Sequence, residues 1–168
     1  MVLHSSISSM SSGIPLVGER TRVYLLPGEL QVSDKPCQMT TILGSCVAVC
    51  LWDTNLRIGG MNHFLLPACR AGSGCSTRFG DLATRALLQR LLELGSQRQH
   101  LKAKLFGGSA LFRSEARYES SLGANNVAAA RLMMNNAGIP VIAQDTGGSL
   151  GRKIVFNTDD GSAWSRQV

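Results

Sequence analysis

The chain has 168 residues, of which 44% are hydrophobic and 17% are charged, and its formal net charge is +6. This length and balance are those of a single globular domain with a core of its own, and they exclude an intrinsically disordered chain. The basic residues are scattered and do not form dense runs with aromatic residues between them, so nucleic-acid binding is not expected. The positive charge favours encounters with acidic protein partners.

The N-terminal stretch, residues 1–19, is rich in Ser and has no apolar periodicity. We interpret it as a flexible extension that precedes one domain at residues 20–168. It lacks the basic and apolar regions of a signal peptide, and no later run is long enough to span a membrane, so a cytoplasmic protein is expected. In that compartment the cysteines are expected to be mostly free thiols. The cysteines are Cys37, Cys46, Cys50, Cys69 and Cys75.

Apolar runs in the first half of the chain predict strands. Residues 23–26 form a short strand that a turn closes. Two longer apolar runs, residues 47–52 and 58–66, flank the polar residues 53–55. This pattern predicts a β-hairpin buried on both faces. The Gly- and Ser-rich residues 69–80 that follow are typical of a surface loop.

Helical periodicity begins after this loop. Leucines at helical spacing predict a helix over residues 82–94, with Asp81 as its N-cap and Gly95 as its stop. The remaining predicted elements are a strand at 101–105, a helix at 125–137, a strand at 139–143 and a closing hairpin at 153–157 and 163–168. Strands therefore outnumber helices. We predict an α/β fold, a layered mixed β sandwich with helices on one side.

Cys46 and His63 lie on the two strands of the predicted hairpin. With the turn centred between Thr54 and Asn55, the two residues face each other on the same side of the sheet, with Cβ atoms about 4.5–5.5 Å apart. Proton transfer from the thiol to the imidazole yields the thiolate that attacks a carbonyl carbon, and it lowers the pKa of the thiol. The spacing thus predicts a Cys–His dyad.

Residues just upstream of Cys46 suit the same chemistry. Gly44 and Ser45 let the backbone bend tightly, so that amide N–H groups could point at a developing oxyanion. A hydroxyl or carbonyl of Thr40 or Thr41 could hold the imidazole in one tautomer. The spacing alone does not decide between these two threonines.

Two other interpretations remain open from the residues alone. The first is structural, because a cysteine or a histidine in an apolar strand is often a buried core residue. The second is a zinc site in which Cys46 with Cys50, and Cys69 with Cys75, join a histidine. Neither pair has the tight Cys-x2-Cys spacing of a zinc knuckle, which disfavours this interpretation.

Three segments of the sequence carry a family resemblance. They are residues 40–50 (TTILGSCVAVC), residues 61–67 (MNHFLLP) and residues 144–154, which contain QDTGG and GRKI. Together they resemble CheD, the chemoreceptor glutamine deamidase family of bacterial chemotaxis. The resemblance implies a fold similar to the catalytic domain of cytotoxic necrotizing factor toxins. It also implies Cys46 as the nucleophile, His63 as the general base and acid, and Thr40 as the third catalytic residue.

The same resemblance implies an activity and partners. The expected enzyme is a protein-glutamine glutaminase, an amidohydrolase that converts glutamine side chains of methyl-accepting chemotaxis proteins to glutamate and ammonia through a thioester on Cys46. No cofactor and no metal are expected, and a CheC-type phosphatase is a second implied partner. Asn125 stands where the family commonly has Arg. Two alternatives stay open: a non-catalytic chemotaxis adaptor that binds the CheC phosphatase or receptors, and a cysteine hydrolase of a small amide.

Overall fold

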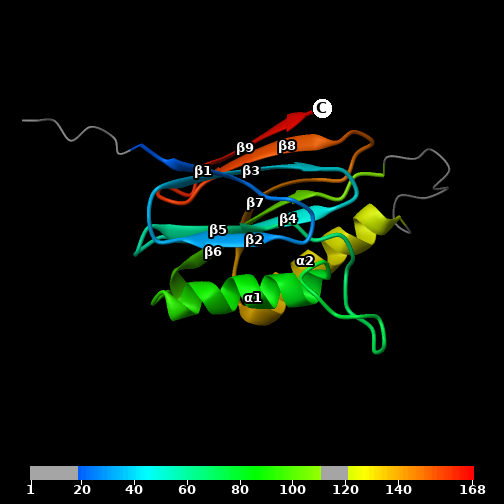
Figure 1. The fold of residues 1–168 in the computed structure, drawn as a ribbon, viewed down its shortest axis with the longest axis horizontal. Helices are drawn as coiled ribbons and strands as arrows, with labels where there is room; N and C mark the ends of the chain where they lie inside the picture. Colours follow the sequence, from blue (N-terminus) through cyan, green and yellow to red (C-terminus); the bar gives the residue numbers. More distant parts are fainter. Residues whose placement is uncertain (1–18, 111–120) are drawn as a thin grey trace, which may run out of the picture.

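The computed structural model describes residues 19–110 and 121–168, which form three layers (Figure 1). The outer layer is a sheet of β1 (Thr21–Tyr24), β3 (Cys37–Leu43), β8 (Arg152–Asn157) and β9 (Ala163–Gln167), in that order. The middle layer is a sheet of β2 (Leu30–Ser33), β5 (Ile58–Asn62), β4 (Val47–Asp53), β6 (Leu101–Gly107) and β7 (Val141–Thr146), in that order. The third layer consists of α1 (Gly80–Glu93) and α2 (Leu122–Ala137), and a short 3-10 helix, η1 (Arg98–His100), precedes β6.

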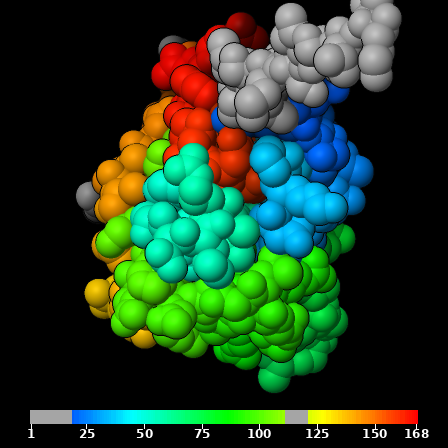
Figure 2. Space-filling view, turned by 90° about the vertical axis from the view of Figure 1, so that its left-hand side faces the viewer, coloured from blue at the N-terminus to red at the C-terminus, as the bar shows by residue number. Residues whose placement is uncertain are grey.

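This arrangement confirms the predicted fold class, a layered α/β sandwich with helices on one side. Seen from one end, the red and blue segments of the four-stranded sheet lie above the green of α1, with the cyan-green β4–β5 segment between them (Figure 2). The implied similarity to cytotoxic necrotizing factor toxins and the boundary of a single domain stay predictions. The predicted extension, residues 1–19, lies outside the described residues except for Glu19.

Two hydrophobic cores hold the layers together. The core between the two sheets includes Leu25, Met39, Leu43, Met61, Phe106 and Phe156. The core between the five-stranded sheet and the helices includes Leu51, Phe64, Leu87, Leu91, Leu105 and Met134. The strand β4 contributes to both, because successive side chains of a strand point to opposite faces. Six of its seven residues are buried, which confirms the prediction of a strand buried on both faces.

The β4–β5 hairpin forms as predicted, but its register differs by two residues. Asp53 pairs with Ile58, and the same register continues to a bridge at the first residue of β4. By this register Cys46 lies across from Leu65. The predicted direct pairing of Cys46 with His63 is therefore wrong.

The cause of the shift is the turn that Asp53 organises. Its carboxylate oxygen accepts hydrogen bonds from the backbone N–H groups of Asn55 and Leu56, both at 2.8 Å. Arg57 then adopts a φ of 57°, in the left-handed region, and its N–H donates to the Asp53 carbonyl. An aspartate that binds the backbone of the following residues in this way widens the turn, so its centre lies one residue later than predicted.

The helix α1 starts and ends close to the predicted positions, but its N-cap differs. Phe79 occupies the N-cap and provides no side-chain hydrogen bond. Asp81 lies inside the helix, where its carboxylate accepts from the backbone N–H of Cys69 at 3.1 Å, so the predicted cap is wrong. Gly95 follows the C-cap with a φ of 97°, which confirms its role as the stop.

The helix α2 begins three residues earlier than predicted. Ser121 is its N-cap, and the Ser121 hydroxyl accepts from the N–H of Ala124 at 3.1 Å. Gly138 ends the helix with a φ of 68°, as predicted. Within the described part of the chain, no helix combines the length and the apolar character that crossing a membrane requires.

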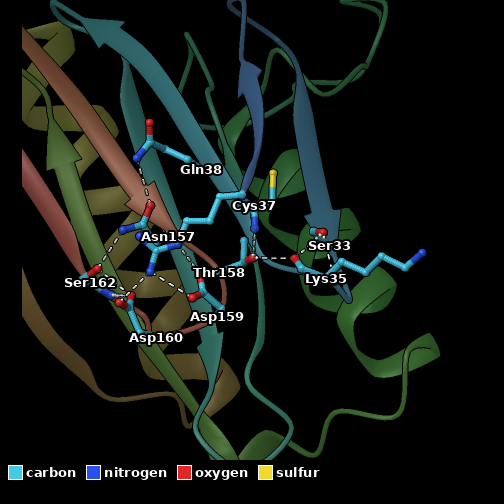
Figure 3. A network of polar contacts seen from close by, with 10 residues as sticks. Ser33, Lys35, Cys37, Gln38, Asn157, Thr158, Asp159, Asp160 and Ser162 are labelled. Atoms are coloured by element: carbon cyan, nitrogen blue, oxygen red, sulfur yellow. Dashed lines mark hydrogen bonds and ion pairs between the residues drawn. The ribbon is translucent and has the colours of Figure 1, made fainter. Parts of the chain in front are cut away.

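A polar network joins β3 to the β8–β9 turn (Figure 3). The Thr158 hydroxyl donates to the Lys35 carbonyl at 3.0 Å and accepts from the N–H of Cys37 at 3.1 Å. At the same turn, the guanidinium of Arg20 makes two hydrogen bonds to the Asp159 carboxylate, at 2.8 and 2.9 Å. These contacts attach the residues before β1 to the sheet and enclose Cys37, which is a structural thiol.

The cysteines divide into one disulfide and three free thiols. Cys69 and Cys75 are bonded, with Cα atoms 5.6 Å apart, so the expectation of free thiols is wrong for this pair. Their separation of six residues on one surface loop brings the Cα atoms within the range that a disulfide spans. The free thiols are Cys37, Cys46 and Cys50. Nowhere in residues 19–110 and 121–168 do three His, Cys, Asp or Glu side chains gather as a metal site requires.

Candidate active site

Cys46 lies in the short link that carries the chain from the four-stranded sheet to the five-stranded sheet. The link begins after Leu43, the last residue of β3, and ends at the first residue of β4. The Cys46 side chain is half-buried beside the core between the sheets, whereas Cys37 and Cys50 are buried. Among the three free thiols, Cys46 is therefore the one that a substrate can reach.

The carbonyl groups of the link are all held from one side. The oxygens of Gly44, Ser45 and Cys46 each accept a hydrogen bond from the segment that follows β6 or from α2. The donors are, in that order, Ser109 N at 2.9 Å, Asn126 Nδ2 at 2.9 Å and Gly108 N at 2.8 Å. With three successive carbonyls fixed, the N–H groups of the link are oriented too. Among the described residues, the N–H groups of Gly44 and Ser45 have no hydrogen-bond acceptor.

Gly107 makes the close approach behind Cys46 possible. It has a φ of 103°, in the left-handed region that favours glycine. A Cβ atom at this position would collide with the carbonyl oxygen of Cys46 and would also touch the side chain of Leu43. Any larger residue would therefore push the link away from β6.

His63 follows β5, and its side chain crosses to the other sheet. The His63 N–H donates to the Glu29 carbonyl at 2.9 Å, and the His63 carbonyl accepts from Gly28 at 2.7 Å. The imidazole is 2% exposed, and its Nδ1 lies 2.8 Å from the Thr41 hydroxyl oxygen on β3. The β1–β2 connection thus holds the backbone of His63, and the opposite sheet holds its ring.

The Thr41 hydroxyl determines the tautomer of His63. It donates its single proton to the Leu25 carbonyl at 2.8 Å, because a carbonyl can only accept. The Thr41 oxygen must then accept from His63, which places the imidazole proton on Nδ1. Nε2 is left unprotonated, and it is buried without a hydrogen-bond partner among the described residues. His63 therefore presents an unprotonated Nε2 to the core between the sheets.

Thr40 does not contact this ring. Burial alternates along β3, so Thr41 faces the core between the sheets while Thr40 faces outward. On the outer face Thr40 lies between its strand partners Tyr24 and Val155. The structure thus brings Thr41, the neighbour of Thr40 in sequence, beside His63. The implied catalytic role of Thr40 stays a prediction.

Cys46 and His63 are brought to the same side of the five-stranded sheet, but they are not direct partners. The observed register makes them diagonal neighbours, for which a Cα separation of about 7–8 Å is typical. Both side chains face the core between the sheets, since Cys46 packs against that core and His63 reaches Thr41 across it. A looser contact than a hydrogen bond is common between catalytic groups before substrate binds.

Burial favours the neutral forms of both groups. It raises the pKa of the Cys46 thiol, although the N–H of the same residue acts in the opposite direction. Burial also lowers the pKa of His63, against the smaller effects of the Leu25 carbonyl and of Glu29. The expectation of a lowered thiol pKa is therefore wrong. Both shifts favour a protonated thiol and a neutral imidazole over the ion pair.

Asn126, which no sequence motif indicated, connects the two strands of the site. Its side chain is fully buried, and its Nδ2 donates to the carbonyls of Ser45 and Leu65, both at 2.9 Å. Two carbonyl acceptors determine the orientation of the amide, because only its nitrogen can donate. Asn126 thus ties Ser45, which precedes Cys46, to Leu65, which lies across from Cys46. A polar residue on the buried stripe of α2, next to Val127, was the available signal.

The third sequence motif, residues 144–154, supports the link that contains Cys46. Arg152 is 3% exposed and donates to the Asp145 carboxylate at 2.6 Å and to the Ser109 hydroxyl at 3.2 Å. Ser109 in turn holds the carbonyl of Gly44. The residues of the GRKI and QDTGG motifs therefore position the link through Ser109.

Known proteins resemble this chain over most of its length. The family described as "CheD chemotactic sensory transduction" matches residues 65–167. "Probable chemoreceptor glutamine deamidase CheD 1" of Anaeromyxobacter dehalogenans is 44% identical over 151 residues, 90% of this chain and 87% of the relative. "Probable chemoreceptor glutamine deamidase CheD" of Trichlorobacter lovleyi is 41% identical over 140 residues, 83% of this chain and 86% of the relative. Among solved structures, the Bacillus licheniformis hypothetical protein YfiH has a TM-score of 0.46 and 14% identity, over 71% of this chain and 51% of that protein.

The alignments and the family match complement each other. The family match begins at residue 65 and so does not include Cys46 or His63. The alignment with the Anaeromyxobacter relative spans 151 of the 168 residues, so it necessarily includes both positions. Identity above 40% over at least 80% of both chains is far more than a shared fold requires. The chain therefore belongs to the CheD family.

Proposed function

We propose that the protein is a chemoreceptor glutamine deamidase, which hydrolyses glutamine side chains of methyl-accepting chemotaxis proteins to glutamate and ammonia. Membership of the CheD family and the names of its relatives support this activity. The observation that carries the proposal is the unprotonated, buried Nε2 of His63, which Thr41 orients on the same side of the sheet as the Cys46 thiol. A thiol beside an oriented base is suited to acyl transfer.

The reaction begins with a proton transfer that accompanies attack. The Cys46 sulfur bonds to the carbon of the glutamine amide while His63 Nε2 takes the thiol proton. The imidazolium then donates that proton to the departing nitrogen, and ammonia leaves a thioester on Cys46. Nε2 next takes a proton from water, whose oxygen attacks the thioester carbon. Return of the proton to sulfur releases glutamate and restores the thiol.

The link before Cys46 is the candidate oxyanion hole. Each tetrahedral intermediate carries negative charge on the former amide oxygen. The N–H groups of Gly44 and Ser45 have no acceptor in the described residues, and the fixed carbonyls of the link keep them oriented. Donors that are oriented before the reaction stabilise such charge without further reorganisation. We assign these two N–H groups to the oxyanion.

Mass spectrometry tests the proposal directly. A chemoreceptor cytoplasmic fragment incubated with the protein should gain the mass difference between –OH and –NH2 at each converted glutamine. The Cys46→Ala variant should produce no gain, whereas Cys50→Ala, which changes a buried thiol of the core, should retain conversion. A wild-type protein that binds the fragment without changing its mass would overturn the proposal and favour a chemotaxis adaptor.

The finer claims about location and partners belong to the same proposal. We place the protein in the cytoplasm, with a CheC-type phosphatase as a second partner, on the strength of family membership. Co-purification of the two untagged proteins from a mixture, measured by size-exclusion chromatography, tests the phosphatase contact. Separate elution at micromolar concentration would contradict it.

A further inference from the structure

A row of large side chains crosses the outer face of the four-stranded sheet. Tyr24, Thr40, Val155 and Trp164 are successive partners across β1, β3, β8 and β9. Tyr24 is 52% exposed and Trp164 is 56% exposed, and Ile42 beside the row is 48% exposed. The solvent-facing side of antiparallel strands such as β3, β8 and β9 is normally polar, and contiguous exposed apolar groups mark interaction sites.

Basic residues flank this row, and acidic residues are absent from the sheet. The next row, formed by Ile42, Lys153 and Arg166, carries two positive charges. On the other side of the aromatic row, Arg22 pairs with Gln38. The four strands contain no Asp or Glu at any position. Aromatic residues and arginine are the types enriched at protein interfaces.

The two sheets differ in how their outer faces are covered. Both α1 and α2 pack on the five-stranded sheet, while no helix within the described residues lies on the four-stranded sheet (Figure 1). A row across four strands spans three strand spacings, or about 14 Å. An α-helix with its side chains is about 10–12 Å wide, so one helix fits along or across this face.

We infer that this surface, here called the aromatic face, docks an acidic amphipathic helix of the protein substrate, outside the site that hydrolyses glutamine. The aromatic face consists of Tyr24, Ile42, Val155 and Trp164 with the basic residues Lys153 and Arg166. The inference rests on the proposed deamidase function for the identity of the substrate. The apolar side of the helix covers the aromatic row, and its acidic side chains meet Lys153 and Arg166.

The position of the aromatic face relative to Cys46 favours the substrate as the occupant. Ile42 is four residues from Cys46 on the same continuous stretch of chain, so their Cα atoms are at most about 14 Å apart. A helix rises about 1.5 Å per residue, and ten residues therefore cover this distance. A substrate helix that presents a glutamine to Cys46 is therefore long enough, at about ten residues, to extend to the aromatic face.

Steady-state kinetics on two substrates test this inference. The face variant is the double substitution Trp164→Ala and Arg166→Glu. The matched control is Leu132→Ala with Arg98→Glu, which changes an exposed leucine and an exposed arginine elsewhere on the molecule. The two substrates are a chemoreceptor cytoplasmic fragment and a short peptide that carries one of its target glutamines. Melting temperatures of all proteins are compared first.

The expected result is a split between KM and kcat. The face variant should raise the KM for the fragment by about ten- to thirtyfold, as loss of interface anchors does, without changing kcat. Its kinetics on the peptide, and those of the control on both substrates, should match the wild type. An unchanged KM for the fragment, or an equal loss on fragment and peptide, overturns the inference.

A binding measurement with the receptor fragment distinguishes failure of this inference from failure of the proposed function. If the wild-type protein converts no glutamine, the proposed function fails, and calorimetry with the fragment tests the face in a Cys46→Ala background. A Kd weakened by the same factor in the face variant supports docking, and an equal Kd overturns it.

Two further experiments test other occupants of the aromatic face, namely the residues that precede Glu19 and a nucleic acid. A chain starting at Glu19 tests whether the preceding residues of the protein cover the face. A lower KM for the fragment, with a red-shifted Trp164 emission, would assign the face to those residues and overturn the inference. Binding of single-stranded oligo-dT that the face variant loses would assign it to nucleic acid and also overturn the inference.

Discussion

The two faces of β3 carry adjacent threonines with different surroundings. On the inner face, Thr41 is fully buried, donates to Leu25 and accepts from His63. On the outer face, Thr40 is half-buried in a row with Tyr24 and Val155. Two identical side chains one residue apart therefore have different functions. Thr41 positions the His63 ring, and Thr40 forms part of the outer surface of the sheet.

The different surroundings of Thr40 and Thr41 follow from the alternation of side chains along a strand. A shift of one residue along a strand moves a side chain to the opposite face. Proximity to Cys46 in sequence does not distinguish Thr40 from Thr41, but burial and hydrogen bonds do. Substitutions on the two faces should therefore have separable effects, the inner ones on chemistry and the outer ones on the KM for large substrates.

The largest effect is expected at the centre of the inner face. His63→Asn removes the Nε2 base while it retains a side chain of similar reach, so kcat should fall by about 10²–10⁴-fold. Intact-mass assays of receptor conversion measure the fall, and circular dichroism checks the fold. A folded His63→Asn protein with close to wild-type turnover would show that His63 is only a core residue.

The paired substitutions Thr41→Val and Thr40→Val compare the two faces directly. Valine keeps the shape of threonine but cannot accept from His63 Nδ1, so at position 41 the loss is that of a buried hydrogen bond, about 1–3 kcal/mol. If expressed in the transition state, this loss lowers kcat roughly five- to 150-fold. Thr40→Val should leave kcat unchanged. Equal kcat values for the two variants would contradict the assignment of Thr41.

Two neighbouring asparagines on α2 also differ in burial, since Asn126 is buried and Asn125 is exposed. Asn126→Ala leaves the carbonyls of Ser45 and Leu65 unpaired, which should lower the free energy of unfolding by about 1–3 kcal/mol and also lower kcat. The neighbouring Asn125 is exposed, so Asn125→Ala should change neither quantity appreciably. Urea unfolding and turnover measure both effects. Equal stability of the two variants would show that the bridge from Asn126 is dispensable.

The smallest expected effect is on the pH dependence of stability. Because burial lowers the pKa of His63, the unfolded chain binds a proton at this residue at a higher pH than the folded protein. The contribution of neutral His63 to the free energy of unfolding is complete above the pKa of His63 in the unfolded chain, about 6.5. It is lost as the pH falls through the lower pKa of the folded protein, by at most about 1.4 kcal/mol per pH unit. Urea unfolding at pH 7.5 and 5.5 measures the loss. The free energy of unfolding of His63→Asn should fall less between these pH values than that of the wild type. Identical pH slopes for the two proteins would contradict a buried neutral His63.

Much of the fold could be predicted from local patterns. Apolar runs predicted the hairpin around Cys46, leucine spacing predicted α1, and the glycines after each helix predicted where it ends. These features depend on interactions between residues close in sequence. The alternation of Cys37, Met39 and Leu43 on β3 also places Thr41 on the buried face, so this local pattern distinguishes Thr41 from Thr40.

Other features depend on contacts that no local pattern contains. The hairpin register follows from the Asp53 carboxylate, which selects a wider turn. The raised pKa of the Cys46 thiol follows from burial between two sheets, which is a tertiary property. The role of Asn126 depends on α2 packing against the start of β4, and the Cys69–Cys75 bond depends on the path of a surface loop.

The location of Cys46 in the link between the sheets also bears on how the protein folds. Neither sheet alone contains a complete site, because His63 directly follows β5 of the five-stranded sheet while Thr41 lies on β3 of the four-stranded one. Contacts of this kind join residues distant in sequence, and they form late because loop closure comes first. During refolding, backbone structure should therefore return before enzymatic activity. Recovery of turnover then reports the docking of the two sheets, and a partly folded chain with exposed thiols remains inactive toward receptors.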